Sequence, residues 1–241
     1  MIVLFTDFGL TDPYVGQIHA ILAQEAPEQP VIDLFHAVPG FDIRVGAYLL
    51  SAYARGFPPG TVFVCVVDPG VGSARQPVML RADGCWYVGP DNGLFHIMAR
   101  RARECETYAI RWRPIQLSAS FHGRDLFAPV AASLARGDIP DSAPTTLMMP
   151  EGMAWPDDLA QVLYIDHYGN ANTGLRASSL SLNQGLKIGE HILERARVFA
   201  EVPPKTLFWY ENANGLVEIA ANQDSAAARL GLQIGDSVIV V

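Results

Sequence analysis

An aspartate and an arginine seven residues apart, Asp68 and Arg75, are the side chains whose types and spacing first suggest chemistry. Asp68 ends an apolar, β-branched run over residues 61–67, and a proline and two glycines follow it before the arginine. Ligands of open α/β sheets bind beyond the carboxyl ends of strands, so a carboxylate delivered there under a folded-back guanidinium would form a reaction centre. A structural aspartate that caps its own loop, beside a surface arginine, fits the same pattern equally well.

His122 is the third candidate for reactivity, because it stands between Phe121 and Gly123 at an expected junction of elements. An imidazole that faces a cleft at such a junction titrates near neutral pH. A lone histidine is more often a structural hydrogen-bonding residue, and the six histidines of the chain lack the spacing of a metal site. We therefore expect no metal and no other cofactor.

Two further aspartates, Asp7 and Asp12, follow the first apolar run, Ile2 to Thr6. Either carboxylate could cap a helix, and we expect Asp12 to cap the next one, with Pro13 at the first helical position. A carboxylate that caps nothing can instead accept hydrogen bonds from both hydroxyls of a ribose, as in dinucleotide-binding folds.

A polar break interrupts the second half of the chain at Asp166, Tyr168 and Asn170, which surround Gly169. Turn chemistry alone explains this break, although an aspartate and an asparagine together also suit an ammonium group and the edge of a purine. Asn212 lies in a segment, residues 211–215, whose composition is that of a hairpin turn.

The composition restricts the class of protein. The chain has 241 residues, half of them hydrophobic and 17% charged, with a net charge of −8. An acidic surface disfavours nucleic-acid partners, and no apolar run is long enough for a membrane span. Three widely spaced cysteines and the lack of a visible signal peptide predict a soluble, cytoplasmic protein.

Strand and helix patterns alternate over the first 67 residues, which predicts parallel strands joined by right-handed crossovers. A hairpin that turns at Asp83-Gly84 and a short helix over 126–134 follow, and a proline-rich stretch then separates a region of short β runs. The expected fold class is α/β: an N-terminal, mostly parallel sheet flanked by helices (1–140), a linker (141–159) and a smaller C-terminal barrel or sandwich (160–241). A β unit of that size normally needs a partner surface.

Six ordered motifs give the chain a resemblance that covers nearly its whole length: residues 6–16, 67–72 with Arg75, 89–93, 121–125, 165–170 and 216–222. Together they resemble the S-adenosyl-L-methionine hydroxide adenosyltransferases (S-adenosylmethionine hydrolases), relatives of fluorinase and chlorinase. The resemblance implies an N-terminal α/β domain, a C-terminal β-barrel, and a homotrimer with active sites between subunits.

The resemblance also assigns roles to individual residues. It implies that Asp68, Arg75 and His122 hold and activate water, so that S-adenosyl-L-methionine is hydrolysed to adenosine and L-methionine. Substrate-binding roles are implied for the aspartates, aromatic residues and asparagines noted above and for the strand that closes the pocket: Asp7 (ribose), Asp12, Phe121 and Tyr168 (adenosyl walls), Asp166 (ammonium), Asn170 (adenine), Asn212, Ala220 and Asn222.

Departures from the halogenating relatives are informative. Those enzymes carry a tyrosine at Asp68, a threonine at Val71 and a serine at Gly123, and a fixed anion at Asp68 would repel halide. Their two arginines of the last β segment are replaced by Asn214 and Ala221, so the resemblance does not identify what holds the methionine carboxylate. Halide transfer, a non-catalytic adenosine or S-adenosylmethionine sensor, and purine-nucleoside hydrolysis are the alternatives.

Overall fold

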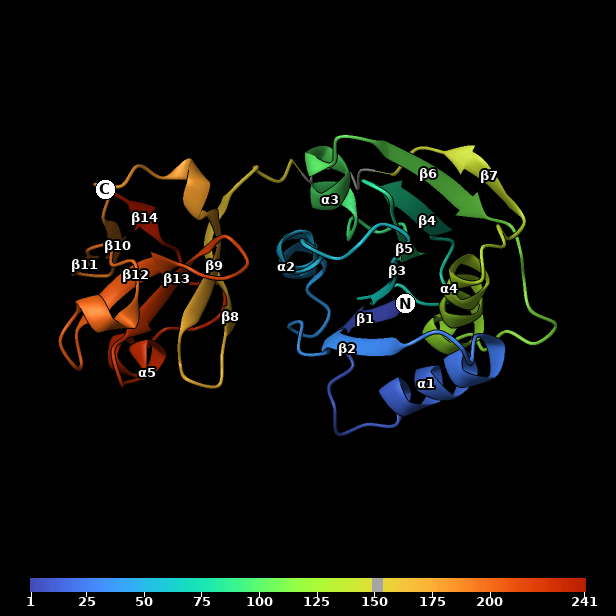
Figure 1. The fold of residues 1–241 in the computed structure, drawn as a ribbon, viewed down its shortest axis with the longest axis horizontal. Coiled ribbons are helices and arrows are strands. Elements are labelled where there is room, and N and C mark those ends of the chain that lie inside the picture. The colour runs from blue at the N-terminus through green and yellow to red at the C-terminus, as the bar shows by residue number, and fades with distance from the viewer. Residues whose placement is uncertain (149–153) are drawn as a thin grey trace. The chain divides into compact units, whose positions relative to one another are not determined.

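The computed structural model describes residues 1–148 and 154–241 (Figure 1). The chain divides into two compact units, Met1–Met153 and Ala154–Val241. In the predicted division, the linker covers residues 141–159 and the second domain begins at residue 160.

The N-terminal unit contains a seven-stranded sheet in its described residues, with strand order β2-β1-β3-β5-β4-β6-β7. Its strands are β1 (Ile2–Thr6), β2 (Val31–Phe35), β3 (Val62–Val66), β4 (Pro77–Ala82), β5 (Cys85–Pro90), β6 (Cys105–Ile110) and β7 (Ser142–Thr145). Strands β2, β1, β3 and β5 pair in parallel, and the remaining pairs are antiparallel. The predicted mostly parallel sheet is confirmed.

Helices cover both faces of this sheet. Helix α1 (Tyr14–Glu25) joins β1 to β2, and α2 (Ile43–Tyr53) joins β2 to β3 on the other side of β1. Helix α4 (Ala128–Ala135) packs with α1, and α3 (His96–Arg101) packs with α2 (Figure 1). The chain passes from β1 to β2 on one side of β1 and then to β3 on its other side. A topological switch point therefore lies between β1 and β3, and ligands of open α/β sheets bind at such points.

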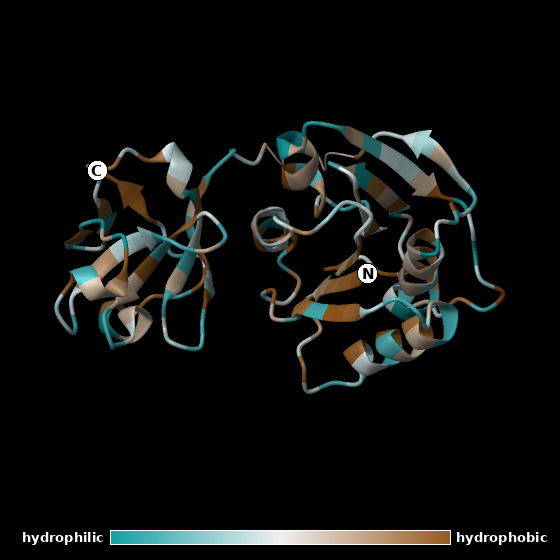
Figure 2. Ribbon diagram, viewed as in Figure 1, coloured by the Kyte–Doolittle hydropathy of each residue, from teal (hydrophilic) through white to brown (hydrophobic). Residues whose placement is uncertain are grey.

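The core of this unit is built from alternate residues of the central strands. Ile2, Leu4, Val62 and Val64 are fully buried against the helix face formed by α1 and α4. Apolar strands therefore run through the middle of the sheet, as Figure 2 shows in brown. Helix α1, in contrast, buries a single apolar face. This packing makes β1 and β3 rigid supports for the side chains that follow them.

The predicted hairpin at Asp83-Gly84 is confirmed. Both residues have positive φ angles, 46° and 84°, and Ala82 pairs directly with Cys85. This is the backbone of a two-residue hairpin turn whose twist matches that of its strands. Strand β7 lies within the predicted linker and pairs with β6, so part of that proline-rich stretch belongs to the sheet.

The expected cap of α1 is wrong. Pro13 itself occupies the N-cap position in a helical conformation, and no side chain caps the helix. Asp12 therefore stands one residue too early to reach the free N–H groups of the first turn. Asp12 is exposed.

The C-terminal unit contains antiparallel sheets of four strands (β12-β13-β9-β8) and three strands (β11-β10-β14) in its described residues. The strands are β8 (Leu159–Ile165), β9 (Ala171–Arg176), β10 (Leu186–Ile188), β11 (His191–Leu193), β12 (Leu207–Glu211), β13 (Leu216–Ala221) and β14 (Ile239–Val240). A short helix, α5 (Ala226–Leu230), is capped by Ser225.

Isolated bridges join these two sheets at both edges. Gln161 of β8 pairs with Ser237 just before β14, and Arg195 just after β11 pairs with Trp209 of β12. The seven strands thus follow one another around a shared core that includes Trp209. This arrangement agrees with the small β-barrel that the family resemblance implies.

None of the helices in residues 1–148 and 154–241 has both the length and the apolar character that crossing a bilayer requires.

Candidate active site

Asp68, Arg75 and His122 meet at the carboxyl end of β3. The Arg75 guanidinium donates from Nε to Oδ1 of Asp68 at 2.8 Å and from Nη2 to Oδ2, so the pair is bidentate. The same Nη2 lies 2.9 Å from Nδ1 of His122. The aspartate and arginine side chains are only 4% and 8% exposed. A buried, fork-shaped ion pair fixes both charges in direction as well as position.

The contact with Arg75 determines the tautomer of His122. A guanidinium has donors only, so Nδ1 of His122 must accept, and the neutral ring carries its proton on Nε2. Burial and the positive charge of Arg75 lower the pKa of His122 below its ordinary 6.5. The imidazole is therefore neutral at pH 7 and presents Nε2–H as a donor.

A close backbone contact holds the two loops of this cluster together. Gly72 has a φ of +80°, and a Cβ atom placed there would lie 2.5 Å from the carbonyl oxygen of Ala119. Only glycine allows the loop that carries Arg75 to lie this near the loop that leads to His122.

The chain after His122 takes an unusual path. Residues Gly123–Phe127 form a π-helical turn directly before α4. The ring of Phe127 lies under the guanidinium of Arg75, 5.4 Å from its central carbon. Single π turns within helices occur often at functional sites, where the extra residue redirects a side chain. Here the turn leaves His122 at its start, beside Arg75.

Asp7 stands beside Asp68, because β1 and β3 are neighbours and both end at this edge. Its Oδ2 accepts a hydrogen bond from the backbone N–H of Phe41 at 3.0 Å. Burial raises the pKa of Asp7, and the nearby negative charge of Asp68 raises it further. Both aspartates therefore lie at the switch point of the sheet. Their partners differ: of the two, only Asp68 has a guanidinium partner among the described residues.

An aromatic cluster adjoins His122. The rings of Phe8, Tyr14 and Phe121 lie 5.4–5.9 Å from one another, with the Phe121 ring edge-on to the other two. A Cβ atom at Gly123 would lie 3.3 Å from both Phe8 and Phe121. Phe8 and Tyr14 were not among the predicted site residues. Their position within the first motif, beside Asp7 and Asp12, is the signal that would identify them.

A cavity of about 670 Å³ in the C-terminal unit brings Asp166, Tyr168 and Asn170 together. Asp166 accepts hydrogen bonds from the backbone N–H groups of Tyr168 (2.9 Å) and Asn170 (2.8 Å) and from the Asn170 side-chain amide (3.0 Å). It organises its own turn, as turn chemistry predicts. A carboxylate has about four lone-pair sites, so it keeps capacity for one more donor.

The cavity is also lined by Phe199, Tyr210 and Glu218, none of which was predicted to bind substrate. Glu218 faces outward from β13 between inward-facing Val217 and Ile219, yet it is only 5% exposed. An acidic residue in the middle of an otherwise apolar strand is the sequence signal for it.

The remaining predicted residues lie near this cavity without lining it. Asn212 turns the β12–β13 hairpin, and its amide donates to Glu218 at 2.8 Å. Ala220 is buried against the Phe208 cluster, and the Asn222 amide donates to the carbonyl of Val202 at 2.7 Å. Their immediate neighbours Ala221 and Gln223 do contribute to the lining.

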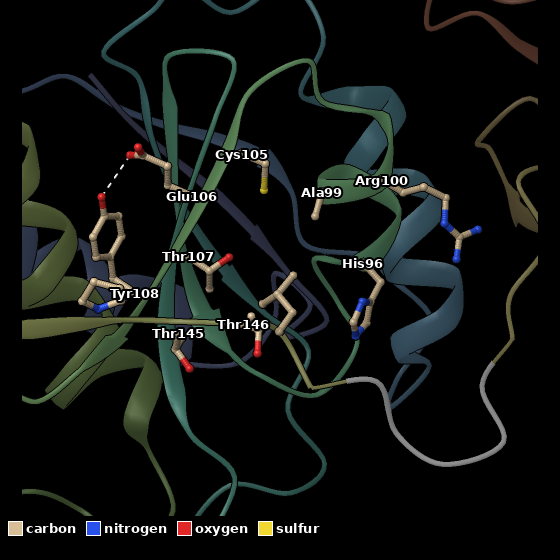
Figure 3. Close-up of a pocket in the computed structure, with 11 residues that line it drawn as sticks. His96, Ala99, Arg100, Cys105, Glu106, Thr107, Tyr108, Thr145 and Thr146 are labelled. Carbon is tan, nitrogen blue, oxygen red and sulfur yellow. Dashed lines mark hydrogen bonds between the residues drawn. The ribbon is translucent and has the colours of Figure 1, made fainter.

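Another hollow, of about 680 Å³, lies between α3 and the β6–β7 edge of the N-terminal sheet (Figure 3). It contains none of the predicted site residues. The Arg100 side chain points away from it, and Glu106 is engaged by the hydroxyl of Tyr108 at 3.0 Å. Among the described residues no three side chains suitable for metal coordination gather here or elsewhere. The cluster of Asp68, Arg75 and His122 is therefore the candidate reactive arrangement.

Comparisons with known proteins place this geometry in a family. Models of the N-terminal and C-terminal domains of the SAM hydroxide adenosyltransferases match residues 2–143 and 160–239. The chain belongs to the SAM hydroxide adenosyltransferase family. It is 38% identical over 250 residues to an (R)-S-adenosyl-L-methionine hydrolase of Salinispora arenicola, with 98% of this chain and 95% of that protein covered.

Two further proteins support membership in the adenosyltransferase family. An (R)-S-adenosyl-L-methionine hydrolase of Thermus thermophilus is 40% identical over an alignment of 249 residues that covers 95% of each chain. The crystal structure of an uncharacterised conserved protein from Thermotoga maritima matches with a TM-score of 0.86 and 30% identity, over 100% of this chain and 99% of that one. The resemblance inferred from the motifs is therefore confirmed.

Proposed function

We propose that this protein hydrolyses S-adenosyl-L-methionine to adenosine and L-methionine, with Asp68, Arg75 and His122 as the catalytic residues. The observation that carries the proposal is the convergence of these three side chains, from positions up to 54 residues apart, on one point beside Asp7. Family membership and the names of the relatives support the same reaction.

The chemistry requires a nucleophile and no acid for the leaving group. Water attacks the ribose 5′ carbon, the carbon–sulfur bond breaks with its electron pair left on sulfur, and methionine departs as a neutral thioether. Free water has a pKa of about 15.7, so hydroxide is scarce at pH 7. Orienting one water in line with that carbon supplies up to roughly 7–11 kcal/mol.

The hydrogen bonds favour Asp68 over His122 as the base. With Nδ1 occupied by Arg75, the neutral imidazole has only its Nε2–H to offer, so it donates to the water oxygen and orients it. Asp68 keeps a second lone pair on each oxygen and can accept the proton. Arg75 then stabilises the hydroxide character of the attacking oxygen. Asp7, whose carboxylate lies at the same edge, binds the ribose hydroxyls in this proposal.

Homotrimeric assembly and a cytoplasmic location are part of the proposal. The family resemblance supports the trimer, and three unpaired cysteines suit a reducing compartment. Light scattering on the purified protein should give three times the 26.2 kDa chain mass.

The decisive experiment is incubation with S-adenosyl-L-methionine in heavy-oxygen water. Adenosine that carries the label on its 5′ oxygen supports attack at that carbon, and free adenine would instead indicate nucleoside hydrolysis. Because the relatives are named for the (R) compound, the (R) and (S) sulfonium epimers should be assayed separately. Binding without methionine release would contradict the proposal, and chloride should yield no 5′-chloro-5′-deoxyadenosine.

A further inference from the structure

The cavity of the C-terminal unit has an unusual charge. Its lining comprises three carboxylates, three aromatic rings and four uncharged residues, with no lysine, arginine or histidine: Asp166, Glu218 and Asp224; Tyr168, Phe199 and Tyr210; Asn170, Ala221, Gln223 and Ser225. Carboxylates together with aromatic faces form the environment that proteins use to bind ammonium and sulfonium cations. A ligand's own carboxylate would find no cation in this lining.

Glu218 is the most buried of the three carboxylates, at 5% exposure. One oxygen accepts from the hydroxyl of Tyr210 and the other from the amide of Asn212. Both donors are neutral, so hydrogen bonds satisfy this carboxylate while its charge stays uncompensated within the described part of the unit. A buried charge of this kind is stabilised when an opposite charge arrives beside it.

Tyr210 remains a donor rather than a second anion. Burial raises its pKa, and the hydrogen bond to Glu218 and the charge of Asp166 raise it further. Asp166 and Glu218 both line this cavity together with Tyr210. Phe199 packs against Tyr210 with ring centroids 5.3 Å apart and completes the wall.

The other two carboxylates differ in their surroundings. Asp166 accepts only from neutral amides of its own loop. Asp224 has the Arg229 guanidinium 3.9 Å away on the exposed side of α5, so its charge is partly compensated. The uncompensated negative charge of the cavity therefore resides on Asp166 and Glu218.

We infer that this cavity recognises the substrate through its ammonium group and does not require its carboxylate, so that the enzyme also hydrolyses decarboxylated S-adenosylmethionine. Glu218 is a second carboxylate for that ammonium, beside Asp166. The inference rests on the proposed function, because water must still displace the thioether at the 5′ carbon. The products are adenosine, 3-(methylthio)propylamine and one proton, and no further reactant is needed.

The test compares three substrates with the wild-type protein: S-adenosyl-L-methionine, the analogue without its carboxylate, and the analogue without its ammonium group. We expect kcat/KM for the decarboxylated compound to equal or exceed that for S-adenosyl-L-methionine. Loss of the ammonium should lower kcat/KM by at least about tenfold, the effect of losing one well-placed charge pair. The reverse order of the two analogues would overturn the inference, whereas no turnover of S-adenosyl-L-methionine would overturn the proposed function instead.

A substitution at Glu218 tests its role independently of that of Asp166. Glu218→Gln keeps the size of the side chain, and its amide oxygen can still accept from Tyr210. We expect it to raise KM for both ammonium-bearing substrates by about tenfold, while KM for the analogue without the ammonium stays the same. The matched control is Glu190→Gln, in an exposed turn of the same unit, which should leave all three values unchanged. A uniform fall in kcat for all three substrates would assign Glu218 a structural role, and the wild-type comparison stands even if the variant does not fold.

Discussion

Two buried carboxylates, Asp68 just beyond the end of β3 and Glu218 on β13, are satisfied in opposite ways. Asp68 receives two hydrogen bonds from one guanidinium, whereas Glu218 receives one each from a phenol and an amide. A compensated carboxylate is held in place and presents a fixed geometry. One that has only neutral donors retains an attraction for a cation. Burial alone therefore does not indicate what an acidic residue does; the charge of its partners does.

Removal of the Arg75 guanidinium should have the largest effect on turnover and stability. We expect Arg75→Ala to lower turnover by orders of magnitude and to reduce the free energy of unfolding by about 3–5 kcal/mol, because Asp68 stays buried without a partner. Urea unfolding and initial rates measure both. Arg75→Lys, which restores the charge without the fork, should recover stability better than turnover. Wild-type turnover in the alanine variant would remove Arg75 from the mechanism.

Asp68→Asn should have the next largest effect. The amide keeps the shape of the side chain but cannot take a proton from water, so we expect kcat to fall about 10²–10⁴-fold. Glu218→Gln is the matched variant in the other unit, and it should leave kcat near the wild-type value because no guanidinium depends on it. Equal losses of kcat in the two variants would contradict the difference drawn between these carboxylates.

His122 should make the activity of the Asp68 cluster depend on pH. Its pKa lies below 6.5, so kcat/KM should stay level down to about pH 6.5 and fall only below it, as the ring gains a proton and loses its contact with Arg75. The unfolded chain binds that proton more readily than the native one, so acidification through this range also lowers stability. His122→Gln should abolish this acid limb along with most of the activity, and His191→Gln should change neither. An acid limb that persists in the His122 variant would assign it to another group.

The smallest expected effect concerns the loop that presents Arg75. Gly72→Ala should lower the free energy of unfolding by more than the roughly 1 kcal/mol expected from a positive φ angle, because its Cβ would meet the Ala119 carbonyl. Gly137→Ala is the control, with a φ of +91° and nothing within 4 Å. Turnover should fall only in the Gly72 variant. Equal stability and activity in both would mean that the contact with Ala119 does not position the cluster.

The parts of the fold that follow simple patterns could be predicted from the sequence. The strands β1, β2 and β3 are short apolar runs between clear turn signals, and the hairpin at Asp83-Gly84 follows from the conformations those two residues tolerate. Asp68 and Arg75 are only seven positions apart in the sequence, so a short loop is enough to bring them into contact. The six ordered motifs gave the family, which the comparisons confirm.

Other features lacked a local signal. Strand β9 is buried from Ala171 to Leu175, yet its centre is an asparagine, a threonine and a glycine, so its hydropathy does not alternate. β7 contains a proline and is an edge strand, which a pattern of residues cannot distinguish from a linker. Glu218 was not predicted to line the pocket for a different reason. Its burial depends on Tyr210 and Asn212, which lie next to it only after the β12–β13 hairpin has paired.

The π-helical turn at Gly123–Phe127 allows His122 and helix α4 to be oriented independently of one another. The apolar side chains of α4, such as Val130 and Leu134, must meet the sheet at fixed angles, and His122 must reach Arg75. In a regular helix each residue advances about 100°, so one register would have to serve both tasks. The wider turn uncouples them. Deleting a single residue there would rotate the imidazole relative to the packed helix by that angle, so chain length in this turn should tolerate less variation than side-chain identity.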